Sequence, residues 1–115
     1  NIVKYLVEHG ADVNHEGRYY GIPLLEACQN IIENENIVKY LVEHGADVNY
    51  KNSFGNTPLI SACTFRHENI VKNIIEHGAN VNYKDNYDNI PIVKACKTGN
   101  ENIIKYVMEH GADEN

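Results

Sequence analysis

The sequence predicts an all-α solenoid of stacked helix-turn-helix units with projecting hairpin loops. The phrase NIVKYLVEHGADVN occupies residues 1–14 and returns unchanged at 36–49. Looser copies occupy 69–82 and 102–115, so successive copies begin 35, 33 and 33 residues apart. The segments between them repeat as well, in the forms GIPLLEAC, NTPLISAC and NIPIVKAC. A fixed period of this size indicates stacked supersecondary units that share one core.

The first helix of each unit is expected to begin at a proline. These prolines each lie nine residues after the Asn that closes the previous copy, at Pro23, Pro58 and Pro91. Proline suits the first helical position, because its missing N–H would have no partner there anyway. Thr57 precedes one of these helices and can cap it, whereas Ile22 and Ile90 hold the same place in the other units and cannot.

The second helix of each unit is predicted from its apolar spacing. In the second copy the apolar residues that share one helical face are Ile37, Val38, Leu41 and Val42. The opposite face carries Glu35, Lys39 and Glu43, four residues apart, and is interpreted as a solvated outer face. A Gly ends each of these helices, and the His before it suits the negative end of the helix dipole.

The period of 33, the Thr-Pro-Leu helix start, the Ala-Cys pair and the Gly-Ala-Asp-Val-Asn closing together resemble the ankyrin repeat. The resemblance covers the whole chain. It implies L-shaped units of two antiparallel helices with a hairpin at right angles, stacked into a curved solenoid that binds proteins along its hairpins and inner helices. The chain departs from the family pattern at several loop positions. The hairpin glycine is kept as Gly55 but replaced by Tyr20 and Asp88, and the glycine before the second helix is kept as Gly99 but replaced by Arg66.

We interpret residues 1–115 as a single array. It would comprise a partial repeat at 1–16 that contributes only a second helix, a repeat at 17–51 with a two-residue insertion, a repeat at 52–84 and a C-terminal repeat at 85–115. The first unit lacks an inner helix to cover its apolar side, so the chain is expected to be part of a longer array. Glu114 replaces a valine of the other copies, which indicates that the stack finishes or frays there.

Composition and spacing disfavour several classes of function. The net charge of −6 argues against nucleic acid and against an anionic membrane surface as partners. The three cysteines occupy one repeat position, so Cys28, Cys63 and Cys96 are expected to be small buried core residues in a reduced, intracellular protein of the cytoplasm or nucleus. No metal site, cofactor or catalytic constellation is predicted, and the chain is not expected to be an enzyme.

Function is expected in the exposed positions that break the repeat. The resemblance assigns these positions to the partner-facing surface: Arg18, Tyr19, Gln29, Asn30, Ser53, Phe54, Asn56, Thr64, Phe65, Asn86, Tyr87, Asn89, Lys97 and Thr98. Tyr19, Phe54 and Tyr87 form one aromatic column, which either contacts a partner or packs hairpin on hairpin. The apolar pair Ile31 and Ile32 in the insertion either tucks against its own unit or meets a partner.

The predicted function is therefore non-enzymatic binding of a protein partner of unknown identity, through hairpin loops and the concave inner-helix surface. The alternative is a structural spacer, or an array that self-associates end to end through uncapped termini. An uncapped apolar end can recruit a copy of itself, so dilution would separate the two hypotheses.

Overall fold

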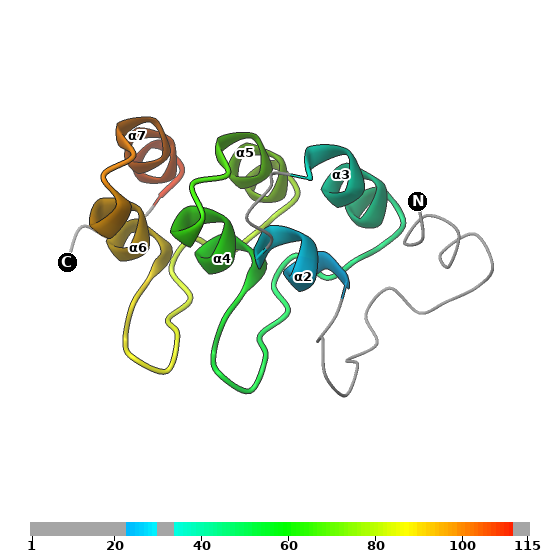
Figure 1. Cartoon of the computed structure of the whole chain (residues 1–115), viewed down its shortest axis with the longest axis horizontal. Coiled ribbons are helices and arrows are strands. Elements are labelled where there is room, and N and C mark those ends of the chain that lie inside the picture. The colour runs from blue at the N-terminus through cyan, green and yellow to red at the C-terminus, as the bar shows by residue number, and fades with distance from the viewer. Residues whose placement is uncertain (1–22, 30–33, 112–115) are drawn as a thin grey trace.

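The computed structural model of the chain describes residues 23–29 and 34–111 (Figure 1). These residues form six helices: α2 (Pro23–Gln29), α3 (Glu35–Glu43), α4 (Pro58–Thr64), α5 (Glu68–Glu76), α6 (Pro91–Thr98) and α7 (Glu101–Glu109). The predicted all-α class is confirmed. The expectations for the first copy, for Ile31 and Ile32 and for Glu114 lie outside the described residues, and the repeat boundaries remain a prediction.

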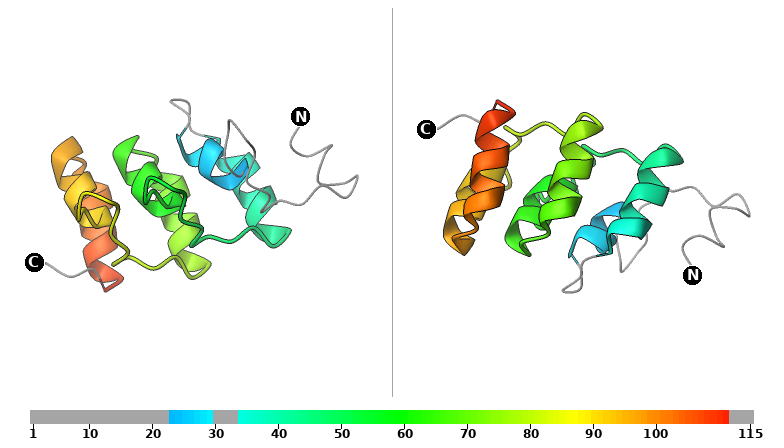
Figure 2. Two further views of the ribbon diagram at one scale, coloured as in Figure 1. Left: turned by 90° about the horizontal axis from the view of Figure 1, so that it is seen from below. Right: turned by 90° about the horizontal axis from the view of Figure 1, so that it is seen from above.

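The helices form two layers. Helices α2, α4 and α6 lie side by side in one row, and α3, α5 and α7 lie side by side in a second row (Figures 1 and 2). Each first helix also packs on the second helix of its own unit, as α4 does on α5 and α6 on α7. The loops that lead from α3 to α4 and from α5 to α6 project away from the second row (Figure 1). The same unit is thus repeated with a common step, as the periodic sequence predicts.

The apolar faces predicted for the second helices form the core between the two layers. In α3, Val38 and Leu41 are fully buried, while Ile37 and Val42 are partly buried and pack against the core. The first helices supply the other side of the core with Leu24, Leu25, Leu59 and Ile60, each almost completely buried. Burying a side chain of this size stabilises the fold by about 1.5–3 kcal/mol, so this core is the main force that holds the stack together.

The helix caps are those that the sequence predicts, with one additional cap at Asn100. The Thr57 hydroxyl accepts a hydrogen bond from the Ile60 N–H at 3.2 Å, as expected, and Ile90 gives no side-chain cap. Asn100, which the sequence analysis did not single out, caps α7 through the Ile103 N–H at 3.1 Å. At the other end of α3, the His44 Nδ1 lies 2.8 Å from the Tyr40 carbonyl oxygen, so this nitrogen carries the proton and donates it.

One prediction about the cysteines is wrong. Cys28 and Cys63 are buried between helices as expected, but Cys96 is exposed. Helix α4 lies between α2 and α6 in its row, whereas α6 has only α4 beside it among the described first helices (Figure 2). Repeat position alone therefore does not bury a residue, because burial also needs the following unit.

Asparagines join successive units through their side chains. The Asn49 side chain donates to the Gly78 carbonyl at 3.1 Å and accepts from the Asn80 N–H at 2.7 Å. One unit later, the Asn82 side chain donates to the Gly111 carbonyl at 3.3 Å. Asn49 and Asn82 are the residues that close two copies of the repeated phrase. Their recurrence was visible in the sequence, but their bridging role requires the stacked arrangement.

Candidate functional site

The two described hairpins are each organised by one polar side chain. In the first, Asn52 Oδ1 accepts from the N–H groups of Phe54 and Asn56 at 2.9 and 3.0 Å. In the second, Asp85 Oδ1 accepts from the N–H groups of Tyr87 and Asn89 at 2.8 and 2.9 Å. These two organisers are 33 residues apart and were missed by sequence reasoning, which considered only the variable neighbours. Each bends its loop so that the next aromatic residue stands at the tip.

Asp85 is held as a buried carboxylate. Burial alone would raise its pKa, but the N–H groups of Asn89 and Tyr87, the Asn89 amide and the Lys94 ammonium together hold the pKa of Asp85 below its usual range. Lys94 Nζ on α6 lies 3.7 Å from Asp85 Oδ2, and the Asp85 side chain is almost fully buried. The carboxylate therefore ties the hairpin to the first helix behind it and has its charge compensated locally.

The hairpins also contact one another. The Asn86 side chain donates to the Ser53 carbonyl at 3.1 Å, which links the second hairpin to the first. Gly55 has φ of +82°, and a Cβ built on it would lie 2.5 Å from Asn86 Oδ1 and 2.6 Å from the Asn86 nitrogen. Only glycine fits at this point. The two described hairpins are therefore in direct contact, through one hydrogen bond and one close approach of their backbones.

The aromatic side chains at the hairpin tips do not pack on neighbouring described residues. Phe54 is 69% exposed and Tyr87 is 81% exposed. Phe65, at the end of α4, is 40% exposed, and its ring stacks on the buried His67 with centroids 6.2 Å apart. Tyr19, the third predicted member of the aromatic column, lies outside the described residues. Of the two interpretations left open by the sequence, packing between hairpins does not hold for Phe54 and Tyr87.

The polar candidates divide into two groups. Several take part in internal hydrogen bonds: Asn56 and Asn89 close their hairpins, Asn86 bridges them, and the hydroxyls of Thr64 and Thr98 donate to helix carbonyls. Ser53 and Lys97 remain exposed, although Lys97 Nζ reaches the Asn89 side-chain oxygen at 3.5 Å. Arg18, Asn30 and the side chain of Gln29 lie outside the described residues.

The turns after α4 and α6 have the same backbone conformation but different residues. Gly99 follows α6 with φ of +73°, and Arg66 follows the end of α4 with φ of +61°. Glycine adopts this left-handed conformation without strain, whereas a residue with a Cβ loses about 1–2 kcal/mol. Arg66 is therefore strained and exposed, at the edge of the surface that carries Phe65.

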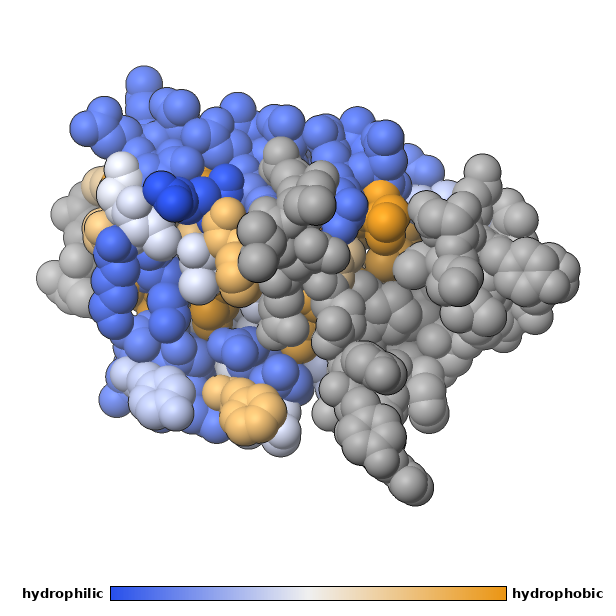
Figure 3. All heavy atoms as spheres, in the orientation of Figure 1, coloured by the Kyte–Doolittle hydropathy of each residue, from blue (hydrophilic) through white to orange (hydrophobic). Residues whose placement is uncertain are grey.

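Charge and polarity differ between the two rows of helices. The second helices carry regularly spaced Glu and Lys, including a Glu35–Lys39 ion pair of 3.7 Å between exposed groups. Figure 3 shows hydrophilic residues along the side of α3, α5 and α7, and hydrophobic residues between the first helices and the loops. The expected solvated outer face therefore lies on the second row. The exposed aromatic residues Phe54, Phe65 and Tyr87 lie on the hairpins and at the end of α4, and Met108 of α7 is the exception, an exposed apolar residue of the second row.

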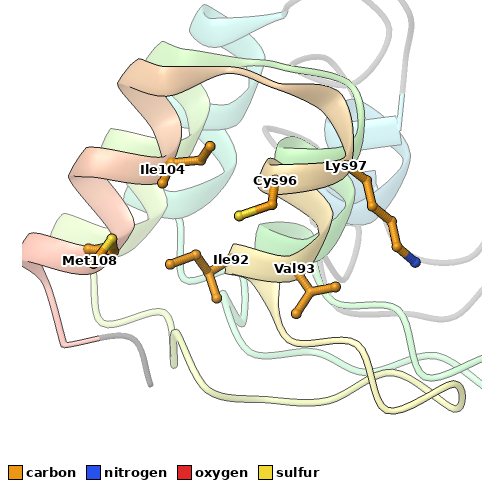
Figure 4. Close-up of a pocket in the computed structure, with 6 residues that line it drawn as sticks. All are labelled: Ile92, Val93, Cys96, Lys97, Ile104 and Met108. Carbon is orange, nitrogen blue, oxygen red and sulfur yellow. The ribbon is translucent and has the colours of Figure 1, made fainter. Parts of the chain in front are cut away.

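A second apolar feature lies between α6 and α7. A hollow of about 530 Å³ is lined by Ile92, Val93, Cys96, Lys97, Ile104 and Met108. Figure 4 shows Ile92, Cys96, Ile104 and Met108 directed into it and Lys97 directed away. One unit earlier, the equivalents of Cys96 and Ile104 are Cys63 and Val71, which are completely buried. The hollow is thus the position that α6 and α7 fill on the preceding unit.

Among residues 23–29 and 34–111, no group of three or more His, Cys, Asp or Glu is placed to hold a metal ion. Burial raises the pKa of the Cys63 thiol to about 12, so this thiol is not a nucleophile at neutral pH. None of the helices in the described part of the chain is long and apolar enough to cross a membrane.

Comparison with known proteins supports the interpretation of the repeated segments as ankyrin repeats. The family model described as ankyrin repeats (3 copies) matches residues 1–52 and 24–115, which together span the chain. No significant match was found among curated proteins.

Proposed function

Because this chain belongs to the ankyrin repeat family, whose members are generally protein–protein interaction modules, we propose that it binds a protein partner through its hairpins and first helices. We call this the hairpin surface and define it by Phe54, Phe65, Arg66, Tyr87 and Lys97. The observation that carries the proposal is the exposure of Phe54 and Tyr87, 69% and 81%, at equivalent hairpin tips.

The exposed rings at the hairpin tips are expected to contribute more to the affinity for a partner than to the stability of the free chain. An aromatic ring that stays in water contributes little to the stability of the free protein, whereas its burial against a partner removes up to about 150–250 Å² of surface from water. Aromatic and Arg residues dominate the energetics of protein interfaces. The contacts between Asn86 and Ser53 hold the two hairpins in fixed relation, so the surface is presented without a large loss of conformational entropy on binding.

The proposed mechanism is complementarity of shape and side chains, with no bond-making step. Family members are typically non-enzymatic. The strained Arg66 beside the exposed Phe65 offers five N–H donors, and Lys97 offers a further cation from the next unit. The partner would rest on the hairpin tips and reach the ends of α4 and α6.

An affinity pull-down from lysate with three baits tests this surface. The baits are the full chain, the variant Phe54→Ala/Tyr87→Ala, and the control Lys39→Ala/Lys105→Ala, whose changes lie on the second helices. The proposal predicts proteins that bind the full chain and the control but not the aromatic variant. Recovery of every bound protein equally on all three baits would show that the hairpin surface is not the binding site.

A second candidate function is self-association, and the hollow between α6 and α7 favours it. Met108 is 41% exposed and Cys96 is exposed, although their equivalents Ile75 and Cys63 are partly and fully buried under the next unit. A second copy of the chain is proposed as the occupant, because a helix pair of the same kind fills this position elsewhere in the stack. Exposed apolar surface of this kind drives association.

Light scattering on serial dilution tests self-association. The second candidate predicts a mass that rises with concentration for the full chain and stays monomeric for Met108→Glu, which places a charge in the hollow. The control variant Lys105→Ala on the same helix should behave as the full chain does. A constant monomeric mass for the full chain across the dilution series would contradict this candidate and leave the hairpin surface unaffected.

A further inference from the structure

We propose that the segment of the partner that docks on the hairpin surface is acidic and carries apolar side chains between its carboxylates. The inference rests on the proposed function, because it names the chemistry of the partner for the same surface. Three features of the molecule support it: the distribution of charge over the two layers, the pairing of each charge, and the strained position of Arg66.

The net charge of −6 is not spread evenly over the molecule. The second helices α3, α5 and α7 each have the pattern Glu-x-x-x-Lys-x-x-x-Glu, which gives six glutamates and three lysines. The hairpins and first helices at residues 50–66 and 83–99 have five basic residues and two acidic ones. The basic residues are Lys51, Arg66, Lys84, Lys94 and Lys97, and the acidic ones are Asp85 and Asp88. These two segments are therefore net positive on a chain that is net negative, and they stay so as a group when Glu26 of α2, the other described first helix, is added.

Internal pairing leaves most of this positive charge available. Asp85 is buried, accepts two backbone N–H groups and lies 3.7 Å from Lys94, so these two charges cancel. Lys97 contacts only the neutral amide oxygen of Asn89, at 3.5 Å, among the partners found for its Nζ. In the described part of the chain, neither Arg66 nor Lys97 lies within ion-pair distance of a carboxylate. No described carboxylate thus compensates these two cations at the ends of α4 and α6.

Arg66 stands where the fold would prefer glycine. Its equivalent one unit later is Gly99, and both residues have positive φ, +61° and +73°. This backbone strain is not offset by an ion pair with any carboxylate in the described part of the chain. A guanidinium at this point gains by binding a carboxylate in two parallel hydrogen bonds, a geometry that a Lys does not provide.

The exposed rings lie on the same side as the cations. Phe65 immediately precedes Arg66, and Tyr87 stands at the tip of the hairpin whose Asn89 contacts Lys97. An acidic protein segment with apolar side chains could pair its carboxylates with the cations and bury its apolar side chains against the rings. A nucleic acid would also meet cations and rings, but it carries a negative charge on every nucleotide. The six glutamates of the second row and the net charge of −6 therefore repel it more strongly than a peptide with a few carboxylates.

Selection from a phage library of random linear peptides on the full chain tests the inference. The selected peptides are then synthesised with a fluorophore, and their binding is measured by anisotropy to the full chain and to Arg66→Glu/Lys97→Glu. The control Lys39→Glu/Lys105→Glu makes the same change of charge on the second row. A single-stranded oligo-dT is measured in parallel, and thermal unfolding verifies that each variant is folded. The milder variant Arg66→Gln/Lys97→Gln replaces the first if that one does not fold.

The inference predicts peptides rich in Asp, Glu and apolar residues, about tenfold weaker binding to Arg66→Glu/Lys97→Glu, and near-unchanged binding to the control. Basic or uncharged peptides that nevertheless lose binding with Phe54→Ala/Tyr87→Ala would overturn the acidic partner and keep the proposed function. Peptides, whatever their charge, that bind Phe54→Ala/Tyr87→Ala as well as the full chain would overturn both. Binding of oligo-dT that is lost with Arg66→Glu/Lys97→Glu would assign the surface to nucleic acid instead.

Discussion

The side-chain oxygen of Asn49 accepts a hydrogen bond of 2.7 Å from the backbone N–H of Asn80, in the following unit. The same side chain donates to the Gly78 carbonyl at 3.1 Å, so one amide pairs with both a donor and an acceptor of the neighbouring backbone. Hydrophobic burial is not directional, whereas a hydrogen bond is. This pair of hydrogen bonds therefore favours one register of the two units, and with it one spacing of the hairpins that form the proposed binding surface.

Replacing Asn49 tests this bridge. Asn49→Ala should lower the free energy of unfolding by about 2 kcal/mol, because two backbone groups of the next unit lose their partner. Asn49→Asp keeps an acceptor for the Asn80 N–H but removes the donor to Gly78, so its loss should lie between zero and that of the Ala variant. Denaturant titration followed by circular dichroism measures both. Equal stability of Asn49→Ala and the unchanged chain would show that the bridge contributes nothing to stacking.

Two glycines with the same backbone geometry should respond differently to alanine. Gly99→Ala introduces a Cβ into open space and should cost only the left-handed strain, about 1–2 kcal/mol. Gly55→Ala adds a collision with Asn86 and should cost roughly twice as much, since overpacking adds about 1–3 kcal/mol. Thermal unfolding of the two variants gives the comparison. If both variants lose the same stability, the neighbouring hairpins are not in the close contact described here.

Acid stability should depend on Asp85. Its pKa in the folded chain lies below the usual value, so the folded state favours the carboxylate. The resulting stabilisation is complete above the unfolded pKa of about 3.9 and is lost as the pH falls through the lower folded pKa. Asp85→Asn keeps an acceptor oxygen, as Asn52 does naturally, and removes this pH-dependent part.

At neutral pH we therefore expect Asp85→Asn to be less stable than the unchanged chain by about 1 kcal/mol, and the difference to shrink as the pH drops below about 4. Urea unfolding at a series of pH values measures it. Asp85→Ala, which leaves two hairpin N–H groups without an acceptor, should be the least stable of the three near pH 7. A pH-independent gap between Asp85→Asn and the unchanged chain would contradict the role of the carboxylate charge.

The three thiols should react at very different rates. Cys96 is exposed in the hollow, whereas Cys28 and Cys63 are fully buried. Burial raises the pKa of the Cys63 thiol to about 12. It also raises the pKa of the Cys28 thiol, and the neighbouring Cys63 adds to that shift. Iodoacetamide should therefore modify Cys96 alone in the folded chain and all three cysteines in denaturant. Mass spectrometry of the digested chain identifies the modified residues. Protection of Cys96 to the same degree as Cys63 would mean that the hollow is covered in solution.

The fold was predictable because the same 14-residue segment recurs in the sequence. Copies such as residues 36–49 and 69–82 keep their apolar positions, and those positions determine the core. The prediction of burial failed where the burial of a residue depends on the neighbouring unit. Cys96 has the sequence context of Cys63 but not the following helix pair that buries it, and no pattern within one repeat distinguishes the two.

The candidate site was predictable only in part. Family resemblance placed the variable positions on one surface, but it could not separate rings that pack from rings that stay exposed, and only the structure shows Phe54 and Tyr87 in solvent. It also could not assign Asn52 and Asp85 their roles, because these residues act on backbone groups two and four positions ahead. The strain at Arg66 became visible only with its φ angle.

Site-specific photo-crosslinking tests the central claim, that the hairpin surface receives the partner, most directly. Benzoylphenylalanine would replace Phe54 or Tyr87 in one pair of variants and Lys39 or Lys105 in a control pair on the second helices. Each variant is irradiated with a partner recovered in the pull-down. Crosslinks from positions 54 and 87 but not from 39 and 105 are the predicted result. Crosslinks confined to positions 39 and 105 would place the partner on the opposite layer and contradict the proposed function.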